Sequence, residues 1–289
     1  MYFPTADISC NPLLPFLAAF AVSCCTSMAG ISGAFVLLPF QMSVLGYTGP
    51  SVSATNQFFN IVACPAGIWR YWREGRFVWP LAGTVALGTL PGVFIGAAAR
   101  IWLLPDPRHF KIFAGLVLLY IGGRMALTVL KALRAGQSDK KPAGGGGPCR
   151  TLVWNARQFA LEFQGQEHRV DCRKLALLSF VIGLVGGIYG IGGGAIMAPF
   201  LVTWFGLPLY LTAGATLCAT ALTSVAGVLF FTLLGTPPDW RLGLLLGLGG
   251  MCGMYLGARM QKFVPANALK GMLAVLLLAM ALRYLFQGI

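Results

Sequence analysis

Acidic side chains are scarce in this chain, which has 8 Asp and Glu against 21 Lys and Arg. The carboxylates all fall in predicted loops or termini, at Asp7, Glu74, Asp106, Asp139, Glu162, Glu167, Asp171 and Asp239. Both histidines, His109 and His168, do so as well. Proton relays and cation sites inside a membrane usually depend on these groups. No base, nucleophile or metal cluster assembles for a membrane enzyme either, so we expect no enzyme activity and no cofactor.

Charged residues of either sign make up only 10% of the 289 residues, whereas 57% are hydrophobic. Several segments therefore meet the requirement of about 20 apolar residues per membrane span. The residues before the first apolar stretch carry one acid, Asp7, and no base, unlike the charged start of a cleavable signal. The composition predicts a polytopic membrane protein that retains its first apolar stretch.

The eight cysteines show no metal-ligand spacing, and most of them lie in apolar runs. We interpret them as packing residues and expect no metal site. Cys149 and Cys172 flank the segment that we expect to be cytoplasmic, where a reducing environment argues against a stable disulfide.

Basic residues are concentrated in two loops. Nine of the 21 Lys and Arg lie between Lys131 and Lys174, and three more, Arg70, Arg73 and Arg76, share one short loop. The positive-inside rule predicts that both loops are cytoplasmic. A basic face near anionic lipid explains the net charge of +13 better than a nucleic-acid surface, so we expect a lipid bilayer and no nucleic acid as partner.

Glycine interrupts an apolar stretch in each half of the chain. In the second half, Gly190, Gly192, Gly193 and Gly194 fall in the middle of the stretch from Leu175 to Gly206. Each glycine costs about 1 kcal/mol in a helix interior relative to alanine, so the cluster should break the helix. Free backbone groups at membrane depth are tolerated only where protein buries them or a polar cavity receives them. The break therefore predicts a binding cavity.

The two halves match element for element, which indicates an internal duplication. The first interrupted stretch recurs 160 positions later, with Gly30, Ile31, Gly33, Pro39, Phe40 and Gly46 matching Gly190, Ile191, Gly193, Pro199, Phe200 and Gly206. With small shifts, Ala54 and Thr55 align with Ala215 and Thr216, and Gly92 and Gly96 align with Gly253 and Gly257.

Each arm of an interrupted stretch is about 15 residues or roughly 22 Å long, short of a hydrocarbon core of roughly 30 Å. We interpret each stretch as a re-entrant hairpin followed by three spans, so that the halves insert as inverted repeats of an all-α membrane protein. Arg100, Arg108 and Lys111 would then lie on the outer side, against the charge rule. A fold of ten complete but short spans stays open.

The predicted domains are a first transmembrane repeat over residues 12–134, a cytoplasmic linker over residues 135–174 and a second repeat over residues 175–289. Residues 135–148, which include four consecutive glycines, are typical of a flexible tether. Residues 151–155 and 159–170 alternate apolar and polar side chains around a glycine-containing turn, which predicts a small β hairpin. A spacer is at least as good an interpretation as a regulatory element.

Polar but uncharged side chains follow each break. Asn56 and Asn60 share a helix face, and Thr216 and Thr220 begin a stripe that continues to Thr223 and Ser224. Such donors, with backbone N–H groups near the breaks, suit an anion that must be held without being trapped. The alternative is that these residues serve helix packing or bond to their own backbone. The candidate substrate-binding residues are Ser32, Gly33, Thr55, Asn56, Gln57, Asn60, Tyr189, Gly192, Gly193, Gly194, Thr216 and Thr220.

The second break carries the residues of a recognisable pattern. The run from Gly187 to Leu201 (GIYGIGGGAIMAPFL), with Ala215–Ser224 (ATLCATALTS) after it, resembles the TauE/SafE sulfite exporter family, also called TSUP transporters. The run from Gly30 to Pro39 is similar to the first repeat of that family but has Ser32 and Ala34 where the second half has Gly192 and Gly194. The resemblance covers nearly the whole chain and implies a carrier for small sulfur-containing anions such as sulfite, thiosulfate or organosulfonates.

The leading hypothesis is an exporter of such an anion, located in a bacterial cytoplasmic membrane and binding its substrate between the repeats. Export of an anion is favoured by an interior-negative potential and needs no proton-carrying carboxylate. The alternatives are a pore-like anion channel and a membrane accessory subunit of a sulfur-metabolising system. The sequence leaves open the anion, the coupling ion, the direction of transport and the oligomeric state, a homo-oligomer included.

Overall fold

A computed structural model of the chain describes residues 1–28, 31–134, 150–155, 157–163, 166–194, 196–260 and 266–288. The first half contains helices α1 (Leu13–Met28), α2 (Ala34–Ser43), α3 (Ser51–Arg73), α4 (Trp79–Trp102) and α5 (Pro107–Arg134). The second contains α6 (Cys172–Tyr189), α7 (Met197–Trp204), α8 (Leu209–Leu233), α9 (Trp240–Met260) and α10 (Ala266–Gly288). The segment 135–149, expected to be a flexible tether, lies outside the described residues.

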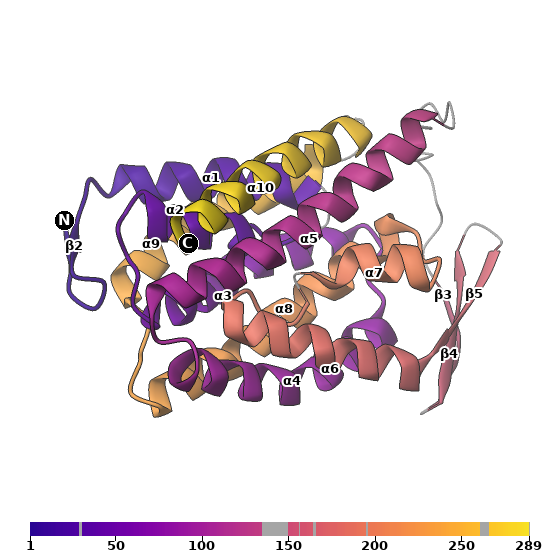
Figure 1. Cartoon of the computed structure of the whole chain (residues 1–289). Helices are drawn as coiled ribbons and strands as arrows, with labels where there is room; N and C mark the ends of the chain where they lie inside the picture. Colours follow the sequence, from indigo (N-terminus) through magenta and orange to yellow (C-terminus); the bar gives the residue numbers. More distant parts are fainter. Residues whose placement is uncertain are drawn as a thin grey trace.

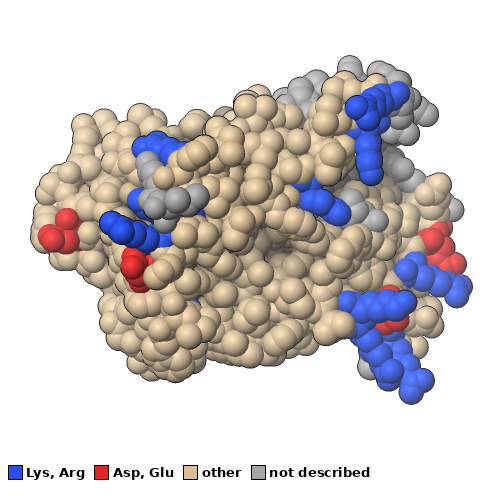
Figure 2. Space-filling model, viewed as in Figure 1, with Lys and Arg blue, Asp and Glu red and all other residues tan. Residues whose placement is uncertain are grey.

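The six spans expected after the two breaks agree with α3, α4, α5, α8, α9 and α10 to within a few residues. Within the described part of the chain, five helices are long and apolar enough to cross a membrane: α4, α5, α6, α8 and α9. Figure 2 shows most of the charged side chains on one face towards the two ends of the bundle, with a broad band between them that has few charged residues. This distribution is typical of a polytopic membrane protein.

Both interrupted stretches are broken helices, as predicted. In the second half, α6 begins at the N-cap Asp171, whose Oδ1 accepts from the backbone N–H groups of Arg173 and Lys174 at 2.9 and 3.4 Å. The helix ends where Gly190 takes the left-handed conformation, with φ of 81°. In the first half, α1 and α2 are separated at the corresponding place, although Gly30 itself is not among the described residues.

Helices of one half pack mainly against helices of the other. The first helix of each half packs against the fourth helix of the other half: α1 packs on α9, and α6 packs on α4. Helix α3 packs on α8 and α9, while α8 packs on α3 and α4, and α5 pairs with α10. Exchanging the two halves therefore leaves the main helix pairs unchanged.

Rows of glycine make the crossed pairs close. A Cβ atom on Gly92 or Gly96 of α4 would lie 2.3 Å from a backbone oxygen of α6. In the same way, a Cβ atom on Gly253 or Gly257 of α9 would lie 2.3 or 2.2 Å from a backbone oxygen of α1. Small residues at a spacing of four let membrane helices approach to backbone contact. The glycine pairs that align between the halves therefore have the same structural role in both.

The segment after α5 forms a three-stranded antiparallel sheet, one strand more than the expected hairpin. Strand β4 (Gln158–Phe163) lies between β3 (Arg150–Trp154) and β5 (Gln166–Asp171), and β5 leads directly into α6. A short hairpin of β1 (Tyr2–Phe3) and β2 (Ile8–Ser9) precedes α1. In Figure 1 the sheet lies at the right end of the bundle, and the two chain termini lie towards the left.

Candidate functional site

Asn56 of α3 joins the breaks of both halves. Its Nδ2 lies 2.9 Å from the carbonyl oxygen of Ala34, at the start of α2, and 2.9 Å from that of Gly190, at the end of α6. Its Oδ1 accepts from Nε2 of Gln41 at 3.2 Å. An amide has two donor hydrogens, so both are in use here. The side chain is fully buried, and it brings the two breaks together at one point of α3.

Asn60, one turn further along α3, repeats this arrangement. Its Nδ2 lies 2.9 Å from the carbonyl oxygen of Ile191 and 3.3 Å from Oγ of Ser224. Its Oδ1 accepts from the hydroxyl of Ser32, which belongs to the first break. The predicted pair Asn56 and Asn60 thus shares one face, and that face contacts backbone carbonyls of the broken helices.

The glycines of the second break pack against α4 and α8. Gly192 takes the left-handed region, with φ of 75°, which favours glycine. The N–H of Gly193 donates to Oγ1 of Thr223 at 3.0 Å, and a Cβ atom on Gly193 would lie 2.3 Å from Cβ of Thr89. A Cβ atom on Gly194 would lie 2.2 Å from the carbonyl oxygen of Thr216. No side chain fits at Gly193 or Gly194 without displacing a neighbouring helix.

The two predicted threonines of α8 bond to their own helix. The hydroxyl of Thr216 lies 3.0 Å from the carbonyl oxygen of Thr212, and that of Thr220 lies 2.8 Å from the carbonyl oxygen of Thr216. Both hydroxyls are buried beside the glycine break. A threonine hydroxyl that donates to its own backbone still has lone pairs that accept. It would have to rotate before it could donate to an anion.

Tyr189 and Gly33 hold the ends of the two breaks. The hydroxyl of Tyr189 donates to the carbonyl oxygen of Phe35 at 3.0 Å, so the last residue of α6 is fixed to the first turn of α2. Gly33 is the N-cap of α2, and a Cβ atom there would lie 3.0 Å from Oγ of Ser23. Both residues therefore lie at the meeting point of the broken helices.

Gln57 differs from the other candidates because its amide is buried without a partner. Neither its Oε1 nor its Nε2 has a hydrogen-bond partner among the described residues. The hydroxyl of Ser53, one turn earlier on α3, is also buried without a hydrogen-bond partner among the described residues. Gln57 faces Gly227 of α8, where a Cβ atom would lie 1.6 Å from Oε1. Buried polar groups without partners are costly, so the amide of Gln57 is a candidate contact for a polar ligand.

Thr55 is the candidate that points away from the breaks. Its Oγ1 accepts from the backbone N–H of Asp239 at 2.8 Å and lies 3.1 Å from the hydroxyl of Tyr47. Asp239 in turn accepts from the N–H groups of Thr5 and Ala6, at 3.0 and 3.2 Å. Burial raises the pKa of the Tyr47 phenol to about 12, so it stays protonated at neutral pH. Thr55 thus joins loops at one end of the bundle.

Sequence reasoning did not select several residues that the fold brings to the breaks. Gln41 of α2 donates to Asn56 of α3, and Thr89 of α4 lies against Gly193 of the second break. The sequence around these two residues carries no polar pattern. Thr223 and Ser224 belong to the polar stripe that was noticed in the sequence, and both receive bonds from the site. The helical spacing of that stripe is therefore the sequence signal for Thr223 and Ser224.

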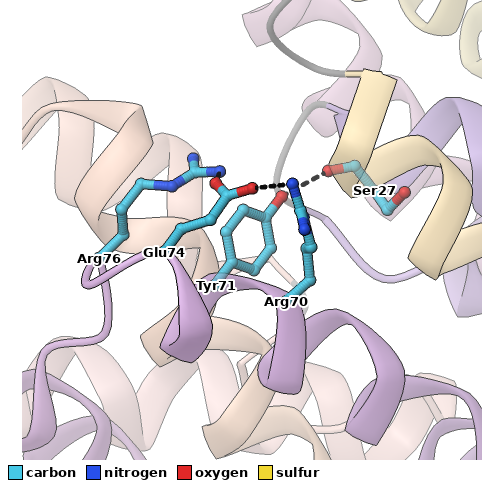
Figure 3. Close-up of polar contacts among 5 residues, drawn as sticks. All are labelled: Ser27, Arg70, Tyr71, Glu74 and Arg76. Carbon is cyan, nitrogen blue, oxygen red and sulfur yellow. Dashed lines mark hydrogen bonds and ion pairs between the residues drawn. The ribbon is translucent and has the colours of Figure 1, made fainter. Parts of the chain in front are cut away.

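A charged cluster lies where α3 ends, beside the last turn of α1. Glu74 contacts two arginines: Arg70 at 2.6 Å between Nη2 and Oε1, and Arg76, whose Nη2 bonds to Oε2. Tyr71 donates to the carbonyl oxygen of Ser27 at 3.0 Å, and the guanidinium of Arg76 lies 4.8 Å from the centre of its ring (Figure 3). The basic loop of the first half is therefore tied to the end of the first broken arm.

An apolar groove of about 500 Å³ runs along the outside of the bundle between α5, α6 and α7. Phe113, Tyr120, Val181, Ile196 and Phe200 are among its lining residues. A lining of this kind offers little to an anion and faces the side where lipid chains would lie. The breaks, with their amides and hydroxyls, are the better candidate for a polar solute.

The two breaks are held by uncharged groups, and the candidate site contains no described carboxylate. Within the described residues, no group of three or more His, Cys, Asp and Glu side chains could hold a metal ion. Uncharged hydrogen-bond donors can bind an anion and release it again without a change in protonation of the protein. The arrangement therefore offers binding of a small solute through donors and backbone.

A family model described as "Sulfite exporter TauE/SafE" matches residues 15–284, nearly the whole chain. The chain belongs to the sulfite exporter TauE/SafE family. "Probable membrane transporter protein YunE" of Bacillus subtilis (strain 168) is 26% identical over 204 residues, which are 70% of this chain and 68% of that protein. "Probable membrane transporter protein" of Xylella fastidiosa (strain 9a5c) is 21% identical over 273 residues, which are 90% of each.

No solved structure matches this member of the family. The family model and the similar proteins indicate a membrane transporter, and the five long apolar helices among the described residues agree with that. The chain is accordingly an integral membrane transporter of the TauE/SafE family.

Proposed function

We propose that the chain exports a small sulfur-containing anion, such as sulfite, thiosulfate or an organosulfonate, and binds it between the two halves at the broken helices. The bridge made by Asn56 carries this proposal, since one buried amide contacts the carbonyl of Ala34 and that of Gly190. A solute held there touches both halves at once. Movement of one half against the other would then change the side from which the solute is reached.

Contacts around Asp239 support a re-entrant course of the first broken helix. Thr5, shortly before α1, donates to its carboxylate, and Thr55, just inside α3, accepts from its N–H. The segment before α1 and the segment after α2 therefore meet at the same end of the bundle. A chain that enters at α1 and returns by α2 meets this condition, whereas a single continuous span interrupted at the break does not.

The pairing of helices across the halves supports the inverted-repeat arrangement. A pseudo-twofold axis relating the halves would exchange α1 with α6 and α4 with α9. It would therefore turn the pair α1 and α9 into the pair α6 and α4, and the helices of each pair are in contact. The sheet and the termini lie towards opposite ends of the bundle (Figure 1). With the basic segment 131–174 in the cytoplasm, the C-terminal end of α10 would lie outside.

The uncharged donors at the breaks fit export of an anion. An interior-negative potential favours outward movement of one negative charge by about 2.3 kcal/mol per 100 mV, so no coupling carboxylate is required. Gln57 and Ser53 offer polar atoms that no described protein group occupies. A sulfur oxyanion accepts hydrogen bonds through each of its oxygens, so these groups suit it.

Transport in proteoliposomes tests this function. Vesicles containing the purified chain and loaded with unlabelled thiosulfate should accumulate labelled thiosulfate by counterflow, and the initial rate should saturate with concentration. Flux that rises linearly and shows no counterflow would indicate a channel. Absence of flux for sulfite, thiosulfate and methanesulfonate alike would favour an accessory subunit, and protein-free vesicles serve as the control.

A further inference from the structure

Arg100 is a fully buried cation in the last turn of α4, with 0% of its surface exposed. Its Nη1 donates to the carbonyl oxygen of Leu104, and its guanidinium carbon lies 3.8 Å from the centre of the Phe110 ring. Its Nε and Nη2 are buried and have no hydrogen-bond partner among the described residues. These two atoms form one side edge of the guanidinium, so one complete pair of parallel donors is unused.

This arginine lies near the second break. Gly96, one helical turn before it, faces the backbone of α6, where a Cβ atom would lie 2.8 Å from the N of Ile188. The Phe110 ring that stacks on Arg100 also lies 6.3 Å, between ring centres, from Tyr189, the last residue of α6. Two independent contacts therefore place Arg100 at the level where α6 ends.

A buried guanidinium without a counter-charge is costly, and the described carboxylates do not supply one. The buried carboxylate of Asp239 accepts from three backbone N–H groups, those of Thr5, Ala6 and Leu242. Glu74 and Glu167 form ion pairs with other arginines. Removing a charge from water without a partner is among the most unfavourable steps in folding. A fold that retains such a group is expected to have an anionic partner for it.

A second unused donor lies at the same break. The Cα and Cβ atoms of Ser53 would lie 2.5 and 2.6 Å from a Cβ atom on Gly190, so α3 approaches the end of α6 closely at this point. The hydroxyl of Ser53 is buried and has no partner among the described residues. The end of α6 is thus flanked by Ser53 of α3 and by the Phe110 ring on which the guanidinium of Arg100 stacks.

We propose that Arg100 is the residue that recognises the charge of the transported oxyanion, binding two of its oxygens through Nε and Nη2 beside the second break. This inference rests on the proposed function and adds to it a cationic contact that the uncharged site lacks. The planar guanidinium edge matches the spacing of two oxygens on a sulfite, thiosulfate or sulfonate group. The position of Arg100 also explains why a basic residue occurs at the end of the bundle where the charge rule disfavours it.

The contact belongs to one half only. With Gly92 and Gly96 aligned to Gly253 and Gly257, the position that matches Arg100 in the second half is Gln261. An arginine is therefore present at one of the two equivalent positions. An anion that leaves the second break towards this end meets a fixed positive charge at Arg100.

The test compares Arg100→Gln with Arg108→Gln in the purified full-length protein. Arg108 is exposed in the first turn of α5, so its replacement removes the same charge at the same end of the bundle. Binding of sulfite, thiosulfate, sulfate and methanesulfonate is measured by calorimetry, and the melting temperature is measured with and without each anion. We expect Arg100→Gln to raise the Kd of the bound anion about 10- to 150-fold and Arg108→Gln to change it less than twofold.

The melting temperature distinguishes binding from structure. If Arg100 binds the anion, the anion-free Arg100→Gln protein should melt at the same temperature as the wild type or higher, because an uncompensated charge has been removed, and the shift induced by the anion should be lost. Unchanged affinity in Arg100→Gln, with a lower melting temperature, would overturn the inference and give Arg100 a packing role on Phe110. Arg100→Lys should restore binding only in part, since an ammonium cannot form the fork.

The same measurements separate this inference from the proposed function. A wild-type protein that binds sulfate but none of the three other anions, with binding lost in Arg100→Gln, would support the arginine site and reject sulfite, thiosulfate and organosulfonates as substrates. A wild-type protein that binds none of the four anions would reject both. Wild-type affinity for thiosulfate that persists in Arg100→Gln would keep the proposed function and reject the arginine site.

Discussion

The amide nitrogen of Asn56 lies 2.9 Å from the carbonyl oxygen of Gly190, so a helix of the first half holds the broken helix of the second. The left-handed turn at Gly190 ends α6 and leaves its carbonyl to be satisfied from outside the helix. A backbone carbonyl left without a donor in a buried site is unfavourable. The asparagine therefore stabilises the interrupted backbone on which the proposed site depends.

Replacing Asn56 with leucine should affect both binding and stability. The sequence pattern predicts anion binding that is roughly 10- to 150-fold weaker, through the loss of a hydrogen bond to the substrate. Both donor hydrogens of Asn56 already bond to backbone carbonyls, so we expect binding to weaken through displacement of the two breaks. The geometry adds a cost, because the carbonyls of Ala34 and Gly190 each lose a donor, at about 1 to 3 kcal/mol each. Thermal unfolding and calorimetric titration with thiosulfate measure the two effects separately.

Thr220→Val is the matched comparison for that change. The hydroxyl of Thr220 donates to the carbonyl of Thr216 in its own helix. Because that carbonyl is already part of the helix hydrogen-bond pattern, loss of the hydroxyl leaves no backbone group unsatisfied. The variant should lose less than about 1 kcal/mol of stability. If valine at position 220 weakens binding as much as leucine at position 56 does, the stripe on α8 contributes as much to the site as the asparagine face.

Gly193→Leu should abolish transport while the protein still inserts into the membrane. A Cβ atom at this position would lie 2.3 Å from Cβ of Thr89, so the break has to separate from α4. The N–H of Gly193, which now donates to Thr223, would move with it. Counterflow of thiosulfate in proteoliposomes is the measurement.

Gly83→Leu is the control, since a Cβ atom at Gly83 has no atom within 4 Å and the residue lies in the same helix as Thr89. Normal transport by this variant, with none by Gly193→Leu, would place the effect at the break. Normal transport by Gly193→Leu would remove the glycine turn from the site.

The glycine-interrupted stretches and the spans that follow them were predictable because hydropathy and glycine content act locally. Gly190 and Gly192 need no contact from elsewhere in the chain to end a helix. The approximate bounds of α3 to α5 and of α8 to α10 followed from the same kind of signal. The alternating residues after position 150 likewise predicted strands, although their pairing into three required the fold.

The hydrogen-bond partners at the site were not predictable, because they depend on contacts between distant residues. Asn56 and Gly190 are 134 residues apart, and no pattern in either segment states that they meet. Arg100 lies near the end of α4, and the sequence predicted only that it would be on the outer side of the membrane. Its burial results from the packing of α4 on α6 and from the return of Phe110 over its side chain.

The inverted-repeat topology predicts opposite accessibility for two glutamines. In a background without cysteine, Gln166→Cys on β5 should react with an impermeant thiol reagent only after the cytoplasmic face is opened. Gln287→Cys, near the end of α10, should react from the outside in intact cells. Because α5 and α10 would run in opposite directions, the two labels must differ. Labelling of both positions from the same side would contradict the inverted arrangement.

Glu74→Gln should increase the apparent affinity for anions on the side where the Arg70, Glu74 and Arg76 cluster lies. The carboxylate contacts both guanidiniums beside the last turn of α1, and its removal leaves their positive charge unopposed (Figure 3). One unit charge contributes about 0.4 kcal/mol at a distance of about 10 Å in a water-like dielectric, so KM for thiosulfate should fall about twofold.

Glu167→Gln is the control, because it removes an equal charge from an exposed pair with Arg169 on β5, away from the helices. Raising the ionic strength from about 0.05 to 0.5 M should abolish the difference between Glu74→Gln and wild type, since the screening length then falls below about 5 Å. A twofold effect that persists in high salt would mean that Glu74 acts through the position of α1, by way of Tyr71 and Ser27, and not through the electrostatic potential.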